Sequence, residues 1–424
     1  MLKQNYEMNR LEFDRRKVIN IWYLNIGCEI IWGNIHEKGR WNNNHINASE
    51  QLCALLSNPN DLLILQNDIP NIVEENFHEL GLPLCKRYIL QNNISYYISE
   101  NILNDHYLIE TLKDMNMQGY LMQLIPFGVT CYDILISNIT KIRIWGADIS
   151  LSTKFNNKIN VLNLCGQLDI PCPLHEVFDK FERNKILEFY SRCTSHNAVM
   201  KTEYGASGKA LYKVNSEKDI DLFKKYLDKL GLKENFYCEE WLTDATSFNH
   251  QIIIDNGLIK RLPISFQIVD NGIYRGSRFT DTSKELNYLC ESIEKKVYQH
   301  INNKNGVISM DGIFDRENIY PIIDLNLRFS LSTYLFGINR RKNRKKNRVF
   351  SVIYITCKLD ILQVKERLNN FKYNQKEDKG AGVIMFSKNA YGEFKRIYFY
   401  FIEEDESKLA ELEKNFLCTL QLKK

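Results

Sequence analysis

The sequence predicts a mixed fold in which an N-terminal α/β domain precedes α+β units. The chain has 424 residues, which is too long for one ordinary hydrophobic core, so two or three domains are expected. Apolar strands alternate with helical segments up to about residue 150, which is typical of an open α/β domain. Beyond residue 200, glycine-bearing turns join strands in pairs, which indicates the hairpins of α+β units.

The first region contains four apolar runs that predict strands. In the first run, at 17–33, a buried strand is followed by a turn into asparagine-rich sequence. The other predicted strands lie at 61–66, 120–128 and 141–148. Helical segments such as 48–58 separate them, so an open α/β domain is expected from about 17 to 150. This region carries no recognisable phosphate-binding fingerprint, so it indicates no function by itself.

The remainder of the chain alternates helices with paired strands. Helices are predicted at 158–171, 216–231 and 283–303. Strands or hairpins are predicted at 198–201, 210–214, 235–242, 250–269 and 307–330. From about residue 349 a strand–helix–strand–strand–helix pattern predicts a small α+β unit.

Composition favours an ordinary soluble protein and excludes several classes. Hydrophobic residues make up 44% and charged residues 25% of the chain. A net charge of +4 is too small to imply a polyanionic partner. The eleven cysteines include no CxxC pair, which favours reduced thiols over disulfides or zinc. The N-terminus is polar and no apolar run reaches about 18 residues. We therefore expect a cytoplasmic protein without a membrane span.

A loop of small residues lies between two predicted strands. Gly205, Ala206, Ser207 and Gly208 would let backbone N–H groups approach phosphate oxygens closely. Lys201, at the end of the first strand, could reach the same phosphates. A hairpin loop without a ligand explains the loop equally well. A Walker loop is excluded, because no GK[ST] sequence precedes a helix here.

A second hairpin carries polar side chains in an apolar setting. Asp311 interrupts one strand, and Asp324, Asn326 and Arg328 alternate on the next. Residues two apart share a face of a strand, so the last three project together. Two carboxylates and an amide oxygen suit Mg²⁺, and an arginine beside them could hold an anion. The alternative is a solvated face with an ion pair, but apolar neighbours indicate burial, where lone carboxylates are costly.

Taken in order, these motifs resemble the ATP-grasp superfamily. The resemblance covers about residues 150–335. Its parts are a lysine that opens a helix ending in I-P-x-P (Lys158 to Pro173), V-x-K before the small-residue loop, the acid pair of Glu239-Glu240-Trp241-Leu242, and D-x-N-x-R. It implies three regions: a pre-ATP-grasp α/β domain (1–150), an ATP-grasp domain of two α+β subdomains (151–338), and a basic loop with a small α+β domain (339–424).

The resemblance also implies site residues. Lys158 and Lys201 would contact ATP phosphates, and the loop from Tyr204 to Gly208 would cover them. The hinge-strand residues that would receive the adenine are Glu239, Glu240 and Leu242. The ligands of one or two Mg²⁺ ions, for which Mn²⁺ can substitute, would be Asp311, Asp324 and Asn326.

Segments 25–34 and 379–394 look like accessory domains of a natural-product subgroup of ATP-grasp ligases. This subgroup contains the pheganomycin peptide ligase and the butirosin-pathway ligase that loads glutamate onto an acyl carrier protein. Two positions depart from the family's pattern. Asp324 replaces the usual Glu, and Ser309 stands where many relatives have an arginine. Arg275 or Arg328 would therefore have to stabilise the tetrahedral intermediate as catalytic residues.

The implied function is an ADP-forming ligase of antibiotic biosynthesis. It would activate an amino acid, with glutamate as the most specific expectation, as an acyl phosphate for transfer to a carrier-protein thiol or an amine in aminoglycoside side-chain assembly. A free-standing peptide ligase is the nearest alternative. A non-catalytic nucleotide- or nucleic-acid-binding protein is the alternative of another class.

Residues 340–348 contain seven basic residues in nine. Such a run is most often a solvated loop. It could also dock an acidic acyl carrier protein electrostatically. Nucleic acid is less favoured, because no aromatic-interleaved motif accompanies the run.

Overall fold

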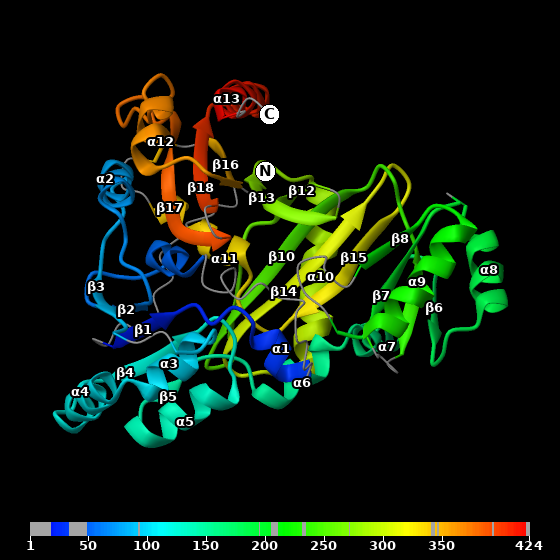
Figure 1. Cartoon of the computed structure of the whole chain (residues 1–424), viewed down its shortest axis with the longest axis horizontal. Helices are drawn as coiled ribbons and strands as arrows, with labels where there is room; N and C mark the ends of the chain where they lie inside the picture. Colours follow the sequence, from blue (N-terminus) through cyan, green and yellow to red (C-terminus); the bar gives the residue numbers. More distant parts are fainter. Residues whose placement is uncertain are drawn as a thin grey trace.

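The computed structural model shows the chain as three sheets with covering helices (Figure 1). The described residues are 18–33, 49–91, 94–194, 196–204, 211–230, 235–270, 272–340, 344–345, 347–391 and 394–420. None of the helices in these ranges combines the length and apolar character that a bilayer crossing requires. All eleven cysteines are free thiols.

The N-terminal region forms a five-stranded parallel sheet in the order β3-β2-β1-β4-β5. Its strands are β1 (Ile19–Tyr23), β2 (Leu62–Leu65), β3 (Lys86–Ile89), β4 (Met122–Pro126) and β5 (Arg143–Ile144). Its helices are α1 (Cys28–Gly33), η2 (Glu50–Leu55), α2 (Asn71–Leu80), α3 (Ile98–Asn104), α4 (His106–Met117) and α5 (Cys131–Thr140). The predicted open α/β fold of this region is confirmed.

Two predicted strands of this region are shorter in the structure. The first ends at Tyr23, because Gly27 takes a φ of 100° and the following apolar residues form α1 instead. Of the strand predicted at 141–148, only Arg143 and Ile144 are in β-conformation, as β5. Apolar character alone does not separate a buried strand from a short buried helix.

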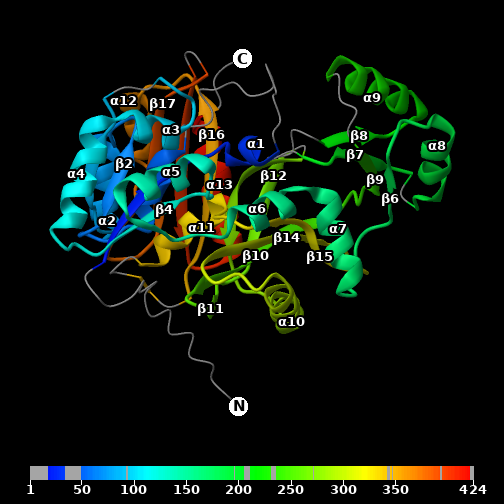
Figure 2. The same cartoon turned by 90° about the horizontal axis from the view of Figure 1, so that it is seen from below.

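Residues 149–240 lead into a four-stranded antiparallel sheet that stands to one side of the molecule (Figure 2). Two helices, α6 (Ile149–Asn156) and α7 (Lys158–Gln167), precede it. In sheet order its strands are β6 (His175–Phe178), β9 (Phe236–Glu240), β7 (Ala198–Thr202) and β8 (Leu211–Val214). The helices α8 (Arg183–Arg192) and α9 (Glu217–Leu230) pack on this sheet around Phe189 and Phe223.

A nine-stranded sheet occupies the rest of the chain, in the order β15-β14-β10-β12-β13-β16-β18-β17 with β11 on β10. Its strands are β10 (Thr246–Asp255), β11 (Leu258–Arg261), β12 (Ser265–Asp270), β13 (Ile273–Phe279), β14 (Gly306–Phe314), β15 (Ile319–Asn326), β16 (Val349–Cys357), β17 (Gly380–Tyr391) and β18 (Phe394–Glu403). Its helices are α10 (Lys284–Ile301), α11 (Leu331–Leu335), η3 (Phe336–Arg340), α12 (Ile361–Leu368) and α13 (Glu406–Leu420).

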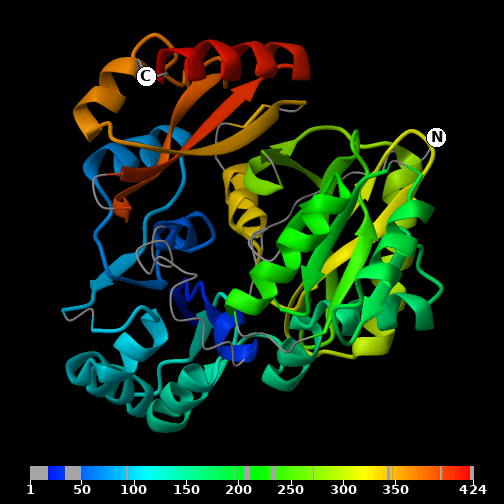
Figure 3. The same cartoon turned by 45° about the vertical axis from the view of Figure 1, so that its right-hand side comes forward.

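This sheet runs through the predicted domain boundary at 338/339, because β13 pairs with β16 in antiparallel register. The division of the chain at that point therefore stays a prediction. Figure 3 shows the C-terminal elements, in orange and red, above both the N-terminal region and the β10–β15 part of the sheet.

The two faces of the β10–β14–β15 part differ in character. One face carries Ile252, Ile308 and Met310, and it packs against Ile293 and Val297 of α10. The other face carries the polar residues of the alternate positions, because side chains along a strand point to opposite sides in turn. Because the hydrophobic face is covered by α10, a binding site for polar ligands can form only on the polar face of this part of the sheet.

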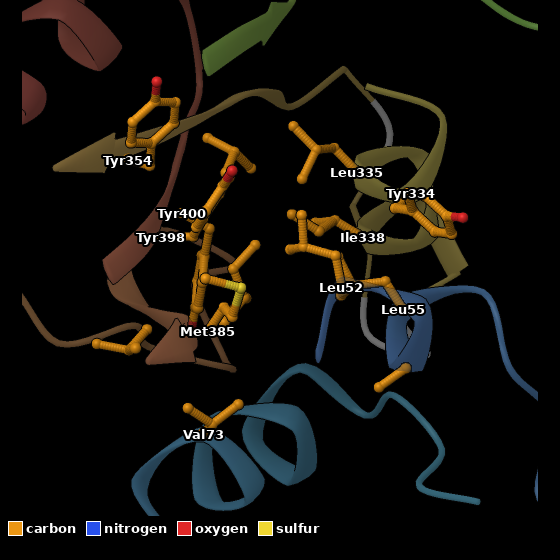
Figure 4. Packing of buried hydrophobic residues seen from close by; sticks show 14 of the residues in the cluster. Leu52, Leu55, Val73, Tyr334, Leu335, Ile338, Tyr354, Met385, Tyr398 and Tyr400 are labelled. Atoms are coloured by element: carbon orange, nitrogen blue, oxygen red, sulfur yellow. The ribbon is translucent and has the colours of Figure 1, made fainter. Parts of the chain in front are cut away.

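The largest hydrophobic cluster joins the N-terminal sheet to the C-terminal strands. Figure 4 shows its centre, where Leu52 and Leu55 of η2 and Ile338 of η3 face Met385 and Tyr398 of the C-terminal strands. These side chains are at most a few per cent exposed. Burial of this kind contributes about 25 cal/mol for each Å² of apolar surface, so the two regions stabilise one another.

Candidate functional site

Two carboxylates face each other across the β14–β15 hairpin. Asp311 on β14 lies opposite Asp324 on β15, and Ser309 lies opposite Asn326. The Asn326 amide donates to Asp324 Oδ2 at 3.5 Å. The structure thus brings the three predicted metal-binding residues together on one face of the sheet.

Asp311 is held by two amide donors on the same oxygen. Asn249 Nδ2 and Gln267 Nε2 each donate to its Oδ1 at 2.7 Å. In the part of the chain that the structure describes, no donor reaches its Oδ2. Burial, and next the charge of Asp324, raise the pKa of Asp311 to about 6. Two neighbouring carboxylates repel each other, and a divalent cation bound between them relieves this repulsion, so this donor set fits Mg²⁺.

A buried polar network fixes the orientation of the Asn249 amide. Its Oδ1 accepts from Gln251 Nε2 at 2.5 Å and from Ser332 Oγ at 3.1 Å, and Thr333 Oγ1 donates to Gln251 Oε1 at 2.6 Å. All four side chains are almost fully buried. The sequence predicted no role for these residues. Their signal was the spacing of Asn249 and Gln251 two positions apart in β10, between Phe248 and Ile252, which places both polar side chains on one strand face.

Lys158 connects the hairpin to the small sheet. Its Nζ lies 2.7 Å from Asp324 Oδ1, and its backbone N–H donates to the Glu203 carbonyl at 2.8 Å. Lys158 opens α7, whose N-cap is Asn157. Lys158, which is predicted to contact the ATP phosphates, therefore lies between the paired carboxylates and the end of β7.

Lys201 on β7 forms an ion pair with Glu239 on β9, with 2.5 Å between Nζ and Oε1. The two side chains are only 10% and 5% exposed, so the charges are largely removed from water. A buried pair of this kind is costly to break on one side alone. Nearby, the Tyr204 carbonyl accepts from Thr202 Oγ1 at 2.8 Å. The predicted loop residues Gly205, Ala206, Ser207 and Gly208 lie outside the described residues.

The end of β9 borders a surface hollow of about 810 Å³. Glu240 accepts from Thr194 Oγ1 at 2.6 Å. The hollow is lined by Thr194, Leu242, Thr243, Asp244, Thr246, Phe314, Asp315, Arg316 and Glu317. The adenine-binding role of Glu239, Glu240 and Leu242 stays a prediction.

The two predicted catalytic arginines have different surroundings. Arg328 pairs with Glu29 of α1 at 2.8 Å and lies 4.7 Å from the centroid of the Phe127 ring. Burial acts to lower the pKa of Arg328, but Glu29, with smaller contributions from Asp324 and Asp311, leaves it raised. Arg275 lies on β13, three strands away from β14 in the sheet order, where its NH2 is 3.4 Å from Asp270. Arg328 thus belongs to the neighbourhood of the paired carboxylates, and Arg275 lies farther along the sheet.

Comparison with known proteins supports the fold. No protein-family model matches the chain. The carboxyaminoimidazole ribonucleotide synthase of Aspergillus clavatus, complexed with ATP, is 11% identical, with a TM-score of 0.56 over 95% of this chain and 98% of that one. Biotin carboxylase of Campylobacter jejuni is 12% identical, with a TM-score of 0.57 over 95% and 91%. The chain has the ATP-grasp fold.

A curated relative matches part of this ATP-grasp chain. The butirosin acyl-carrier protein–L-glutamate ligase of Niallia circulans is 24% identical over 202 residues, which are 45% of this chain. The match covers 47% of the relative's own length, so the chain aligns with about half of that ligase.

Proposed function

We propose that the chain is an ATP-dependent, ADP-forming ligase that activates a carboxylate as an acyl phosphate and transfers the acyl group to a thiol or an amine. The observation that carries this proposal is the facing pair Asp311 and Asp324, with Lys158 bound to one of them. Ordinary strand packing does not require two carboxylates to lie opposite each other across a hairpin. An ATP-grasp fold around them supports a nucleotide and metal role.

Asp311, Asp324 and Asn326 would hold one or two Mg²⁺ ions, or Mn²⁺ in substitution, which would offset the charge of the transferring phosphoryl group. Lys158 and Lys201 would exchange their present carboxylate partners for phosphate oxygens. The loop from Tyr204 to Gly208 would cover the phosphates, and residues 239–242 would receive the adenine.

Neighbouring side chains hold Asp311 and Arg328 in place. Asn249 and Gln267 keep one oxygen of Asp311 occupied, which fixes the direction of the other. Glu29 and Phe127 hold the Arg328 guanidinium beside the carboxylates. From there Arg328 would donate hydrogen bonds to the oxyanion that forms when the acceptor attacks the acyl carbon.

The finer proposal is that the acid is L-glutamate and the acceptor an acyl carrier protein of an antibiotic pathway. It is supported by the partial match to the butirosin ligase. The basic run 340–348 supports docking only in part, because Arg340 donates to the Ser57 carbonyl and Arg348 pairs with Glu404. A free-standing peptide ligase is the second candidate, since the site does not distinguish a thiol from an amine.

The test is ADP release by the full-length chain, screened against the twenty amino acids with and without a phosphopantetheinylated carrier protein. We expect release that depends on one acid and increases with an acceptor. Asp324→Asn is the variant that should abolish it, and Asp281→Asn, at an exposed position in the loop before α10, is the matched control. Formation of AMP, or ADP release that no acid stimulates, would refute the proposal. Salt-sensitive RNA binding without ATP consumption would instead support a nucleic-acid-binding protein.

A further inference from the structure

Two cysteines lie close together where α7 meets the small sheet. Cys165, in the last turn of α7, is buried, and Cys172 is partly buried against the same hydrophobic cluster. The chain folds back between them, because Asp169 takes a φ of 51° and the Ile170 N–H donates to the Cys165 carbonyl at 2.9 Å. The Cys172 thiol donates to the Ile170 carbonyl, with 3.7 Å between sulfur and oxygen. This turn brings the two thiols within hydrogen-bonding reach of each other.

The segment that carries Cys172 also supports the proposed nucleotide site. Two residues farther on, the Leu174 carbonyl accepts from the Glu240 N–H at 2.8 Å, and β6 then pairs with β9. The charges of Glu239 and Lys201 both act on the Cys172 thiol. Cys172 therefore lies close to the buried ion pair whose lysine is proposed to bind phosphate.

The two cysteines belong to different parts of the fold. Cys165 shares its hydrophobic cluster with Ile322 and Leu325 of β15, so it is attached to the nine-stranded sheet. Figure 2 shows α7 where β15 approaches the small sheet. Cys172, by contrast, leads directly into β6 of the small sheet. A covalent bond between the two sulfurs would therefore change how β6, and with it the hinge strand β9, is held against the nine-stranded sheet.

Cys172 has the properties of an attacking thiol, and Cys165 those of a resolving thiol. The hydrogen bond with the Cys165 thiol lowers the pKa of Cys172, although burial acts in the opposite direction. The same hydrogen bond, together with burial, raises the pKa of Cys165. Thiolate character and exposure decide which thiol reacts first. Cys172 is the more exposed of the two and is therefore the first to react.

We propose that Cys165 and Cys172 form a thiol–disulfide switch, which weakens ATP binding when a low-molecular-weight disulfide oxidises the pair. This inference goes beyond the proposed ligase reaction but rests on it, because it places ATP beside Lys201.

The switch operates by thiol–disulfide exchange. The Cys172 thiol loses its proton to water, and its thiolate attacks one sulfur of the reagent, so that a mixed disulfide forms and one thiolate of the reagent leaves. The Cys165 thiolate then attacks the Cys172 sulfur and releases the second thiolate of the reagent. Two protein thiols are thereby oxidised to one disulfide, and the reagent is reduced to two thiols.

The test uses oxidised glutathione as the reagent and the full chain as the protein. ATP binding is measured by equilibrium titration before oxidation, after oxidation and after reduction with dithiothreitol. The Kd for ATP should rise by about tenfold or more on oxidation, because the segment that holds Glu240 shifts with Cys172, and it should return to its first value on reduction. Peptide mapping by mass spectrometry should show the disulfide between Cys165 and Cys172 in the oxidised wild-type chain.

Each variant is compared with itself, as the ratio of the ATP affinities of its oxidised and reduced forms. Oxidation should leave the ATP affinity of Cys172→Ser unchanged. Cys165→Ala should stop at the mixed disulfide, which peptide mapping detects as a glutathionyl group on Cys172. Cys418→Ser, which removes an exposed thiol from α13, is the matched control and should behave as the wild type.

The outcomes separate the switch from the ligase. A wild-type peptide map without the Cys165–Cys172 disulfide, or with it but with unchanged ATP affinity, overturns the inference and leaves the ligase in place. Loss of ATP affinity on oxidation of Cys172→Ser also overturns it, because another thiol is then responsible. The wild-type peptide map decides the matter even where Cys165→Ala fails to fold. A reduced chain that binds no ATP overturns the inference and the proposed function together, whereas a working switch without acid-dependent ADP release overturns the proposed function alone.

Discussion

Replacing Glu294 by glutamine should weaken the sheet that carries the paired carboxylates, and more so at neutral than at alkaline pH. Glu294 is 2% exposed and lies on α10, beneath β10. Its Oε1 is 3.0 Å from Nδ1 of the fully buried His250, and its Oε2 binds Arg261. Removal of one partner from a buried ionic group typically costs about 3–5 kcal/mol.

The pH dependence follows from His250. Burial acts to lower its pKa, but its bonds with Cys290 and Glu294 raise it from 6.5 to about 10. The protonated ring therefore stabilises the fold fully below pH 6.5, and this contribution is lost as the pH rises through 10. At about 1.4 kcal/mol per pKa unit, it amounts to about 4 kcal/mol at pH 6.5 and about 1 kcal/mol at pH 9.5. The cost of Glu294→Gln should fall by about 2–3 kcal/mol between these two pH values.

Hydrogen exchange measured by mass spectrometry on peptides of β10 and α10 gives the local opening free energy at each pH. Glu291→Gln is the matched control, because Glu291 also binds Arg261 but is 61% exposed, and it should cost less than about 1 kcal/mol at either pH. An equal loss for Glu294→Gln at pH 6.5 and 9.5 would show that His250 is not charged in the folded state.

Three further predictions concern the proposed site. Asp311→Asn should lower ADP release by at least about 100-fold and raise the Mg²⁺ concentration needed for the half-maximal rate, measured by Mg²⁺ titration. The exposed control Asp281→Asn should leave both values unchanged, and a normal Mg²⁺ dependence of Asp311→Asn would contradict the metal role. Lys201→Met should weaken ATP binding by about tenfold or more in equilibrium titration. A variant that binds ATP normally would show that Lys201 does not contact the nucleotide. Neutralising Arg344 and Lys345 should raise the KM for a carrier protein about threefold or more at low salt and have little effect at 0.5 M salt, whereas an effect that persists at high salt would argue against electrostatic docking.

The sequence predicted those parts of the fold that local pattern determines. The open α/β region, the two polar hairpin strands and the long helix α10 all follow from periodicity and turn residues within a few positions of one another. Alternation also predicted that Asp324, Asn326 and Arg328 share one strand face. That Asp311 lies opposite Asp324 depends on the register of the hairpin, which the structure gives.

Long-range pairings were not predictable in the same way. Asn249 and Gln267 bind Asp311 from 62 and 44 residues away in sequence, and no local pattern connects these positions. The pairing of β13 with β16 likewise depends on tertiary register. The roles of Lys158 and Arg275 came from a family resemblance alone, whereas those of Lys201 and Arg328 were also suggested by their positions in the sequence. All four stay proposals that the structure makes testable.

The shared hydrophobic cluster has a consequence for how the protein is made. Trp22 and Leu63 of the first two strands are packed in one cluster with Phe401 of β18 and Phe416 of α13. During synthesis the first strands leave the ribosome long before the last helix is made. The hydrophobic surface of the nascent N-terminal sheet therefore stays exposed until the C-terminal elements are available to cover it. We expect the isolated segment 18–144 to aggregate when it is expressed alone, and to become soluble when residues 349–420 are supplied on a second chain.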